Sequence, residues 1–211
     1  MKLFLLLLTS IAISLAAPTI FYSKFFPGSK PEYVGVLVMR DGAVEYREAK
    51  DEEPLRFHLD KIDVDLIFAQ AEKVGNFSRP LESGLPVARM GEKSYRYEDG
   101  PVKSEVKFNY SQDPDANILQ DFMERIVESE QTLINLERAA RFDRLGVNQV
   151  LLQLQVLVER KRLVCPQQFL KMLDRVAKND VYLNIARDRA AQMAADFRAL
   201  AAPPPTAAEG K

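Results

Sequence analysis

The chain has 211 residues, of which 47% are hydrophobic, and these values fit one large or two small domains with real cores rather than a disordered chain. Its formal net charge of −1 gives no electrostatic reason to expect nucleic acid or an anionic membrane surface as a partner. The single cysteine, Cys165, excludes an intrachain disulfide, and the single histidine, His58, excludes a zinc site rich in histidine. A Ser-His-Asp triad would have to use His58.

Residues 1–16 have the three parts of a secretory signal peptide. Lys2 supplies a short positive region, Leu3 to Ile13 form a mostly apolar stretch, and Ser14 and Ala16 are the small residues at positions −3 and −1. An uncleaved N-terminal membrane anchor is the alternative, but a spanning helix needs about twenty predominantly apolar residues, which is more than this stretch provides. We therefore expect an exported chain, periplasmic or secreted, with no membrane span after cleavage.

The next segment, residues 17–32, is punctuated by Pro27, Gly28 and Pro31 and is predicted to be a leader that runs up to the fold. A run rich in β-branched residues then predicts a buried strand over 33–39. Asp41-Gly42 follows, and Asp-Gly between apolar runs is a strong signal for a hairpin. The return strand is expected over 43–49.

Three further elements complete the first half of the chain. Residues 55–59 alternate apolar and polar side chains and predict a short strand. Helical spacing of apolar residues, after an aspartate in the N-cap position, predicts a helix over 61–74. A second hairpin is expected from 93–98 and 104–110. Residues 33–111 are therefore predicted to form an antiparallel sheet of about five strands that carries one helix.

Two surfaces in this half are candidates for binding. The longest irregular stretch runs from residue 75 to residue 91, and long loops inside compact domains are often functional. The second candidate is the sheet face that the strand patterns leave outside the core. Four polar side chains are expected on that face: Arg56, His58, Glu105 and Lys107.

The second half of the chain, residues 112–200, changes to helical patterning. Asp113 in the N-cap position and Pro114 at the first helical position mark a strong helix start. Short connections between successive apolar stripes predict a bundle of about four antiparallel helices. The proline-rich tail, residues 201–211, is predicted to be disordered. The helices are expected over about 113–146, 147–163, 166–178 and 180–200.

One acidic stretch fits part of a calcium-binding pattern. Asp113, Asp115, Asn117, Asp121 and Glu124 fall at positions 1, 3, 5, 9 and 12 of a twelve-residue calcium loop. The pattern needs glycine at position 6 for a sharp turn, and this chain has isoleucine there. Helix capping and the helix dipole explain the same acids, so no calcium site is predicted.

No catalytic, cofactor-binding or metal-binding residue is assigned from the sequence, and no cofactor is expected. Cys165 is expected to be a small buried hydrophobe beside a helix start. A Cys165–His58 dyad would require the fold to bring the two residues together, and nothing in the sequence predicts that.

Residues 33–74 resemble a module of uncharacterised secreted bacterial proteins, which are known as domains of unknown function. The residues that carry the resemblance are the hairpin pattern Val36-x-Val38-x-x-Asp41-Gly42-x-Val44-x-Tyr46 and a following helix with Ile67-Phe68-x-x-Ala71-Glu72. The resemblance implies a setting in the bacterial envelope and transfers no functional residue.

The sequence thus favours an exported, non-enzymatic α+β protein that binds another protein or envelope component, or has a structural role in the envelope. One alternative is a glycan hydrolase or lyase of the cell wall that uses carboxylates alone and needs two acids in one cleft. Another is a carrier of a small apolar ligand, which needs an apolar pocket between sheet and helices.

Overall fold

The computed structural model describes residues 17–89 and 91–201. Within them the fold is α+β, as predicted, with an antiparallel sheet in the first half and helices in the second. The strands are β1 (Thr19–Phe25), β2 (Tyr33–Met39), β3 (Ala43–Arg47), β4 (Leu55–His58), β5 (Glu92–Asp99) and β6 (Val102–Phe108). The helices are α1 (Lys61–Lys73), α2 (Pro114–Phe142), α3 (Val147–Glu159), α4 (Leu170–Ala177) and α5 (Asn184–Ala201), with two short 3-10 helices, η1 (Gly75–Phe77) and η2 (Pro166–Phe169).

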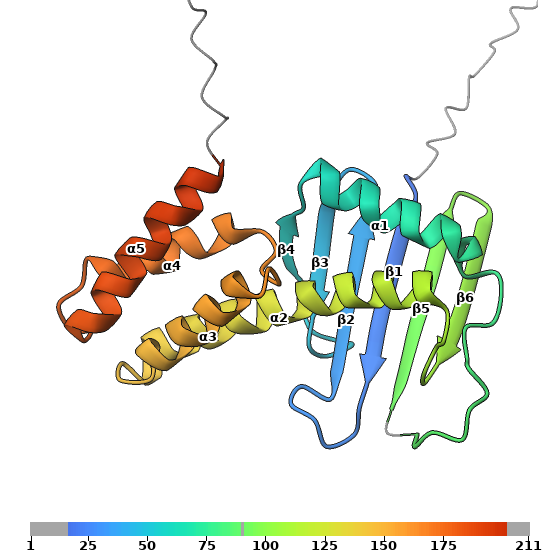
Figure 1. The fold of residues 1–211 in the computed structure, drawn as a ribbon, viewed down its shortest axis with the longest axis horizontal. Helices are drawn as coiled ribbons and strands as arrows, with labels where there is room; N and C mark the ends of the chain where they lie inside the picture. The colour runs from blue at the N-terminus through green and yellow to red at the C-terminus, as the bar shows by residue number, and fades with distance from the viewer. Residues whose placement is uncertain (1–16, 90, 202–211) are drawn as a thin grey trace, which may run out of the picture.

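The sheet has six strands in the described residues rather than about five, in the order β4-β3-β2-β1-β5-β6 (Figure 1). The additional strand is β1, which lies in the segment expected to be a leader. It pairs along all seven of its residues with β2 on one side and β5 on the other. The leader prediction gave too much weight to the prolines and glycine that follow the strand, because these residues form the β1–β2 connection and do not interrupt β1.

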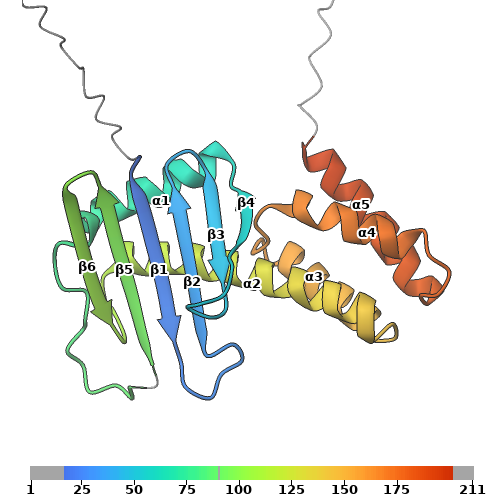
Figure 2. The same ribbon diagram turned by 180° about the vertical axis from the view of Figure 1, so that it is seen from behind.

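Helices α1 and α2 lie on one face of the sheet, and no helix covers the other face in the described residues (Figures 1 and 2). The covered face carries the strand residues that belong to a hydrophobic core. Along each strand, these residues alternate with residues whose side chains point to the uncovered face, which we call the open face. The fully or nearly fully buried strand residues are Ile20, Tyr22, Val34, Val36, Val38, Val44, Tyr46, Tyr95 and Phe108.

The hydroxyl of Tyr95 is buried in this core without a hydrogen-bond partner among the described residues. Burying a hydroxyl without a partner costs free energy, because the group loses its hydrogen bonds to water. Tyr95→Phe is therefore expected to raise the free energy of unfolding by about 1 kcal/mol. Urea denaturation of both proteins checks this, with Tyr22→Phe as the control that should destabilise, since the Tyr22 hydroxyl donates to Glu124 Oε1 at 2.6 Å. An equal loss in both variants would contradict the prediction.

A second core lies among α3, α4, α5 and the C-terminal part of α2. Helix α2 belongs to both cores, with Met123 and Ile126 buried against the sheet and Leu136 buried among the other helices. In Figure 1 the C-terminal part of α2 extends past the β4 edge of the sheet to reach those helices.

The helix ends differ in detail from the predictions. The first long helix ends at Phe142 instead of about residue 146, and Gly146 is the residue before α3 rather than the end of α2. The side chain of Asp143 accepts a hydrogen bond from the Gly146 N–H at 3.0 Å, which stabilises a tight turn at this place. The last helix begins at Asn184 instead of near residue 180. Residues 1–16, the predicted signal peptide, and residues 202–211 of the predicted tail lie outside the described residues.

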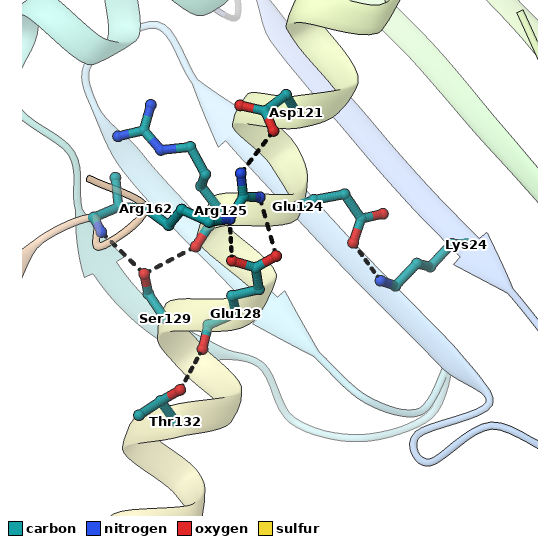
Figure 3. Close-up of polar contacts among 9 residues, drawn as sticks. Lys24, Asp121, Glu124, Arg125, Glu128, Ser129, Thr132 and Arg162 are labelled. Carbon is teal, nitrogen blue, oxygen red and sulfur yellow. Dashed lines mark hydrogen bonds and ion pairs between the residues drawn. The ribbon is translucent and has the colours of Figure 1, made fainter. Parts of the chain in front are cut away.

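Polar contacts fix α2 to the sheet and to the segment that follows α3 (Figure 3). On the sheet side, Glu124 Oε2 accepts from Lys24 Nζ at 2.5 Å. On the other side, Arg162 donates two hydrogen bonds to Glu128, at 2.5 and 3.0 Å, and one to Asp121 at 2.8 Å. Ser129 Oγ accepts from the buried N–H of Val164 at 2.9 Å. These contacts hold the α3–η2 connection against the middle of α2, between the two cores.

Candidate binding surface

The open face of the sheet is the candidate functional surface. Its centre is formed by the outward-facing side chains of the two central strands, β1 and β2, and of β5 beside them (Figure 2). Four partly exposed apolar side chains lie there: Phe21, Tyr33, Leu37 and Met39. We call them, together with Arg47 and Arg96, the open-face patch.

A glycine shapes the middle of the open-face patch. A Cβ atom at Gly35 would lie 2.8 Å from the Tyr33 hydroxyl and 3.3 Å from both Phe21 Cε2 and Arg47 Cγ. The tyrosine, the phenylalanine and the stem of the arginine therefore pack over the bare backbone at this position. A larger residue in place of Gly35 would push these side chains apart. Packing of this kind holds the aromatic rings in place before any partner arrives.

Two arginines flank the aromatic residues. The guanidinium of Arg96 lies 4.8 Å from the centre of the Phe21 ring, at cation–π distance. Arg47 and Arg96 both lower the pKa of Tyr33, while burial has the larger and opposite effect, so this pKa is raised overall. The patch is thus aromatic at its centre and positively charged on two sides.

Ion pairs surround the patch. Arg47 pairs with Glu45 at 3.0 Å and Arg96 with Glu98 at 3.3 Å. Glu45 lies directly opposite Leu37 in the β2–β3 pair, and Glu98 lies two residues along β5 from Arg96. The two acids partly balance the charge of the arginines. The result is an aromatic centre with a mixed polar rim, which is the composition found in protein–protein interfaces, where aromatic residues, Met and Arg are enriched.

The structure places all four polar residues predicted for this face on it, but at its two edges. Arg56 and His58 alternate with Phe57 on the edge strand β4, and Glu105 and Lys107 lie on the edge strand β6. All four are exposed. The centre of the face was not predicted, because Phe21 belongs to the segment that was expected to be a leader. The signal was present in the run Thr19-Ile20-Phe21-Tyr22, which is rich in the β-branched and aromatic residues that favour strands.

The second candidate surface, the stretch from 75 to 91, is anchored at several points in its described part. Phe77 and Leu81 are buried in the sheet core. Glu82 Oε2 accepts from the Asn109 N–H at 2.7 Å, and the Ser83 N–H donates to the carbonyl of Tyr110 at 2.8 Å. Residue 90 lies outside the described residues. The first half of this stretch therefore serves to close the end of the sheet near β6.

The fold brings Cys165 and His58 together through the backbone only. Cys165 Sγ donates to the main-chain carbonyl of His58 at 3.1 Å, a contact that does not involve the imidazole ring. Burial raises the pKa of the Cys165 thiol to about 12, and nearby acids act in the same direction. A thiol with so high a pKa is a poor nucleophile at neutral pH, so the geometry gives no support to a Cys-His dyad.

The acids of the calcium pattern lie in α2 rather than in a loop. Asp113 caps the helix by accepting from the N–H groups of Asp115 and Ala116, and it also pairs with Arg79. Asp121 pairs with Arg162 and Glu124 with Lys24. Among residues 17–89 and 91–201, no group of three or more His, Cys, Asp or Glu side chains is placed to hold a metal ion.

A cavity of about 410 Å³ lies between α3 and α5, away from the sheet. At the β5–β6 end of the sheet, stacked aromatic rings fill the core beneath the helices, with Phe77 and Tyr95 at 4.8 Å and Tyr95 and Phe108 at 5.7 Å between ring centres. Smaller cavities lie between α1 and α2, about 250 Å³, and between the β3–β4 edge and α2, about 240 Å³. The described part of the chain also has no helix with the length and apolar character needed to cross a membrane.

Comparison of the chain with protein-family models and with curated proteins found no match.

Proposed function

We propose that this protein is an exported binding protein of the bacterial envelope that holds a protein partner on the open face of its sheet. The observation that carries the proposal is the open-face patch: aromatic side chains and two arginines at the centre of the sheet, on the face that no helix of the described residues covers. Tyrosine and arginine are the residue types that most often dominate binding energy at such interfaces. The predicted signal peptide at residues 1–16 supports the location.

A protein partner fits the patch better than a nucleic acid does. A nucleic-acid surface needs a clear excess of positive charge for the phosphates. Here Glu45 and Glu98 accompany the two arginines, and the chain as a whole has a formal net charge of −1. A partner that presents an apolar segment next to one or two carboxylates would match both the rings and the arginines.

Site-specific photo-crosslinking in the native host tests this proposal. A photoreactive phenylalanine analogue at Tyr33 or Leu37 is expected to give one discrete protein adduct in the envelope fraction. The same analogue at Ile62, an exposed residue of α1 on the opposite side of the sheet, is the matched control and is expected to give none. Arg96→Glu in the Leu37 probe protein should reduce the adduct at least about tenfold, because a buried contact to a charge at an interface contributes about 2 kcal/mol or more.

Three results would contradict the proposal. Equal adducts at Tyr33 and Ile62 would show that capture is unspecific. The absence of any adduct at both patch positions in well-folded protein would remove the open face as a binding site. An adduct that disappears after nuclease treatment would assign the patch to nucleic acid instead of protein.

A further inference from the structure

The cavity of about 250 Å³ between α1 and α2 lies where the two helices run antiparallel across the covered face of the sheet (Figure 1). The buried part of its lining is apolar, because Ile67 and Leu119 are each 1% exposed. Its outer edge is apolar as well, since Leu66 and Ile118 are 56% and 57% exposed. Sites for drug-sized molecules usually have about 300 to 1,000 Å³, so this cavity suits a smaller ligand.

One end of the cavity carries an acid and a base that are not paired. The buried Nε of Arg125 has no hydrogen-bond partner in the described residues, and the guanidinium lies against the Phe122 ring, 4.9 Å from the ring centre. Asp63 forms no hydrogen bond or ion pair with the described residues either, and burial raises the pKa of its carboxyl group more than the charge of Arg125 lowers it. Arg125 is therefore close enough to act on Asp63 without forming an ion pair with it.

The other charged residues near this end are paired or add to the acid. Asp121, the third charged residue of the lining, accepts from Arg162 at 2.8 Å. Arg162 also binds Glu128, so its charge is balanced. Asp60 adds negative charge on the side of Asp63. Among the described residues, the cavity thus offers one unpaired guanidinium and one unpaired carboxylate, without the excess of positive charge that a simple anion would need.

The opposite end of the cavity has its polar groups satisfied. Gln70 lines this end, and its Nε2 donates to the main-chain carbonyl of Asp115 at 2.9 Å and to the Asp115 side chain at 2.7 Å. The cavity therefore has a charged end, an apolar middle and a closed hydrogen-bond network at its far end. A ligand that fits it carries both charges at one end and an apolar group at the other.

We propose that the α1/α2 cavity binds a free α-amino acid with an apolar side chain, held at its carboxylate by Arg125 and at its ammonium group by Asp63. A zwitterion neutralises both unpaired groups at once, whereas an anion or a cation alone would leave one of them unpaired. An α-amino acid carries its two charges on one carbon atom, which matches an acid and a base that are close but do not touch. The terminal nitrogens of arginine suit a carboxylate, which they can bind through two parallel hydrogen bonds. The apolar side chain then lies between the two helices, along Ile67 and Leu119.

This site is separate from the open-face patch, because α1 and α2 cover the other face of the sheet (Figures 1 and 2). The inference therefore does not rest on the proposed function, and a ligand between α1 and α2 leaves the open face accessible. A ligand that binds only the folded chain also stabilises it in proportion to its concentration.

NMR titration of the methyl-labelled chain with L-leucine tests the proposal. The methyl signals of Leu66, Ile67 and Ile118 are expected to shift in a saturable way, with a Kd below about 1 mM. The signals of Leu152 and Val156, exposed residues of α3, are the control and are expected not to move. Two fragments of leucine are each expected to bind at least about tenfold more weakly, because 4-methylpentanoate lacks the ammonium group and 3-methylbutylamine lacks the carboxylate.

Two variants assign the charged groups to their residues. Arg125→Met is expected to weaken L-leucine binding at least about tenfold without weakening the binding of 3-methylbutylamine, which has no carboxylate to lose. Asp63→Asn is expected to weaken L-leucine binding without weakening the binding of 4-methylpentanoate. The matched control is Glu72→Gln, an exposed residue of α1 outside the cavity, which should leave L-leucine binding unchanged.

The absence of a saturable shift at the cavity methyl groups up to about 10 mM L-leucine would overturn the proposal. A fragment that binds as tightly as L-leucine would overturn it as well, because only one of the two charged groups would then be recognised. Both of these titrations use the wild-type chain, so they decide the question even if a variant loses its fold. If both variants fold and bind L-leucine with wild-type affinity, Arg125 and Asp63 do not hold the ligand and the proposal is wrong.

Discussion

Glu130→Gln is expected to make the protein more stable than the wild type by about 3 kcal/mol at pH 8, and equally stable at pH 4. Glu130 lies in the middle of α2, is 1% exposed and accepts a hydrogen bond from Gln168 Nε2 at 2.9 Å. It has no ion pair with a cation in the described residues. Burial therefore raises the pKa of its carboxyl group to about 7, against the opposing effect of the Gln168 hydrogen bond.

The direction of the effect follows from proton binding. A carboxyl group with a raised pKa in the folded protein binds its proton more tightly there than in the unfolded chain. The stability that it contributes is complete below the unfolded pKa of about 4.5 and is lost as the pH rises through about 7. The amide introduced by Glu130→Gln stays neutral at every pH and can still accept a hydrogen bond from Gln168. This variant therefore does not lose stability as the pH rises through about 7.

Urea denaturation of both proteins at several pH values between about 4 and 8 measures this difference. Glu72→Gln on the exposed side of α1 is the matched control and should leave the pH dependence of the wild type unchanged. Four acids with lowered pKa values, Asp65, Glu82, Asp113 and Asp174, also affect stability, but in the acid range, where their ion pairs or hydrogen bonds are lost as the pH falls. Parallel pH profiles of stability for the wild type and Glu130→Gln would contradict the prediction. They would show that ionisation of Glu130 does not lower the free energy of unfolding at pH 8.

The parts of the fold that the sequence predicted well are those with a local signal. The Asp41-Gly42 hairpin is present, with Gly42 at φ +96°, a conformation that glycine adopts without strain. Asp113 caps α2 as predicted, and its side chain accepts from two backbone N–H groups. In each case the chemistry that forms the element lies within a few neighbouring residues.

The parts that were missed depend on contacts between distant residues. β1 becomes a central strand only because β2 and β5 pair with it, and β5 is more than sixty residues away in the sequence. The position of Tyr33 above Gly35, between Phe21 and Arg47, follows from that pairing. Glu130 was not singled out, because an acid in an amphipathic helix is usually exposed, and only the return of η2 with Gln168 buries it.

Leu136→Ala is expected to lower the free energy of unfolding by about 2 to 5 kcal/mol, and to do so for the sheet as well as for the helices. Leu136 is fully buried among the helices of the second core, although its neighbours Ile134, Glu137 and Arg138 on other sides of α2 border the β3–β4 edge of the sheet. The cavity left by the substitution therefore forms within the second core rather than within the core of the sheet. We expect the sheet to lose the same stability because α2 is continuous between the two cores. Ser129, Arg162 and Cys165 also connect the helical half to the middle of α2 and to β4.

Two spectroscopic signals separate the cores in a single denaturation experiment. Far-UV circular dichroism reports mainly on the helices. Near-UV circular dichroism, measured in a Tyr182→Phe background that removes the buried tyrosine of the second core, reports largely on the buried tyrosines of the sheet, Tyr22, Tyr46 and Tyr95. Both signals are expected to shift together to lower urea concentration in Leu136→Ala. Leu145→Ala, the same substitution at a site that is 73% exposed, is the matched control and should change stability by less than about 0.5 kcal/mol. If the helical signal is lost first and the tyrosine signal keeps its wild-type midpoint, the two cores unfold independently. The contacts of Ser129 and Arg162 would then orient the helical half without stabilising the sheet.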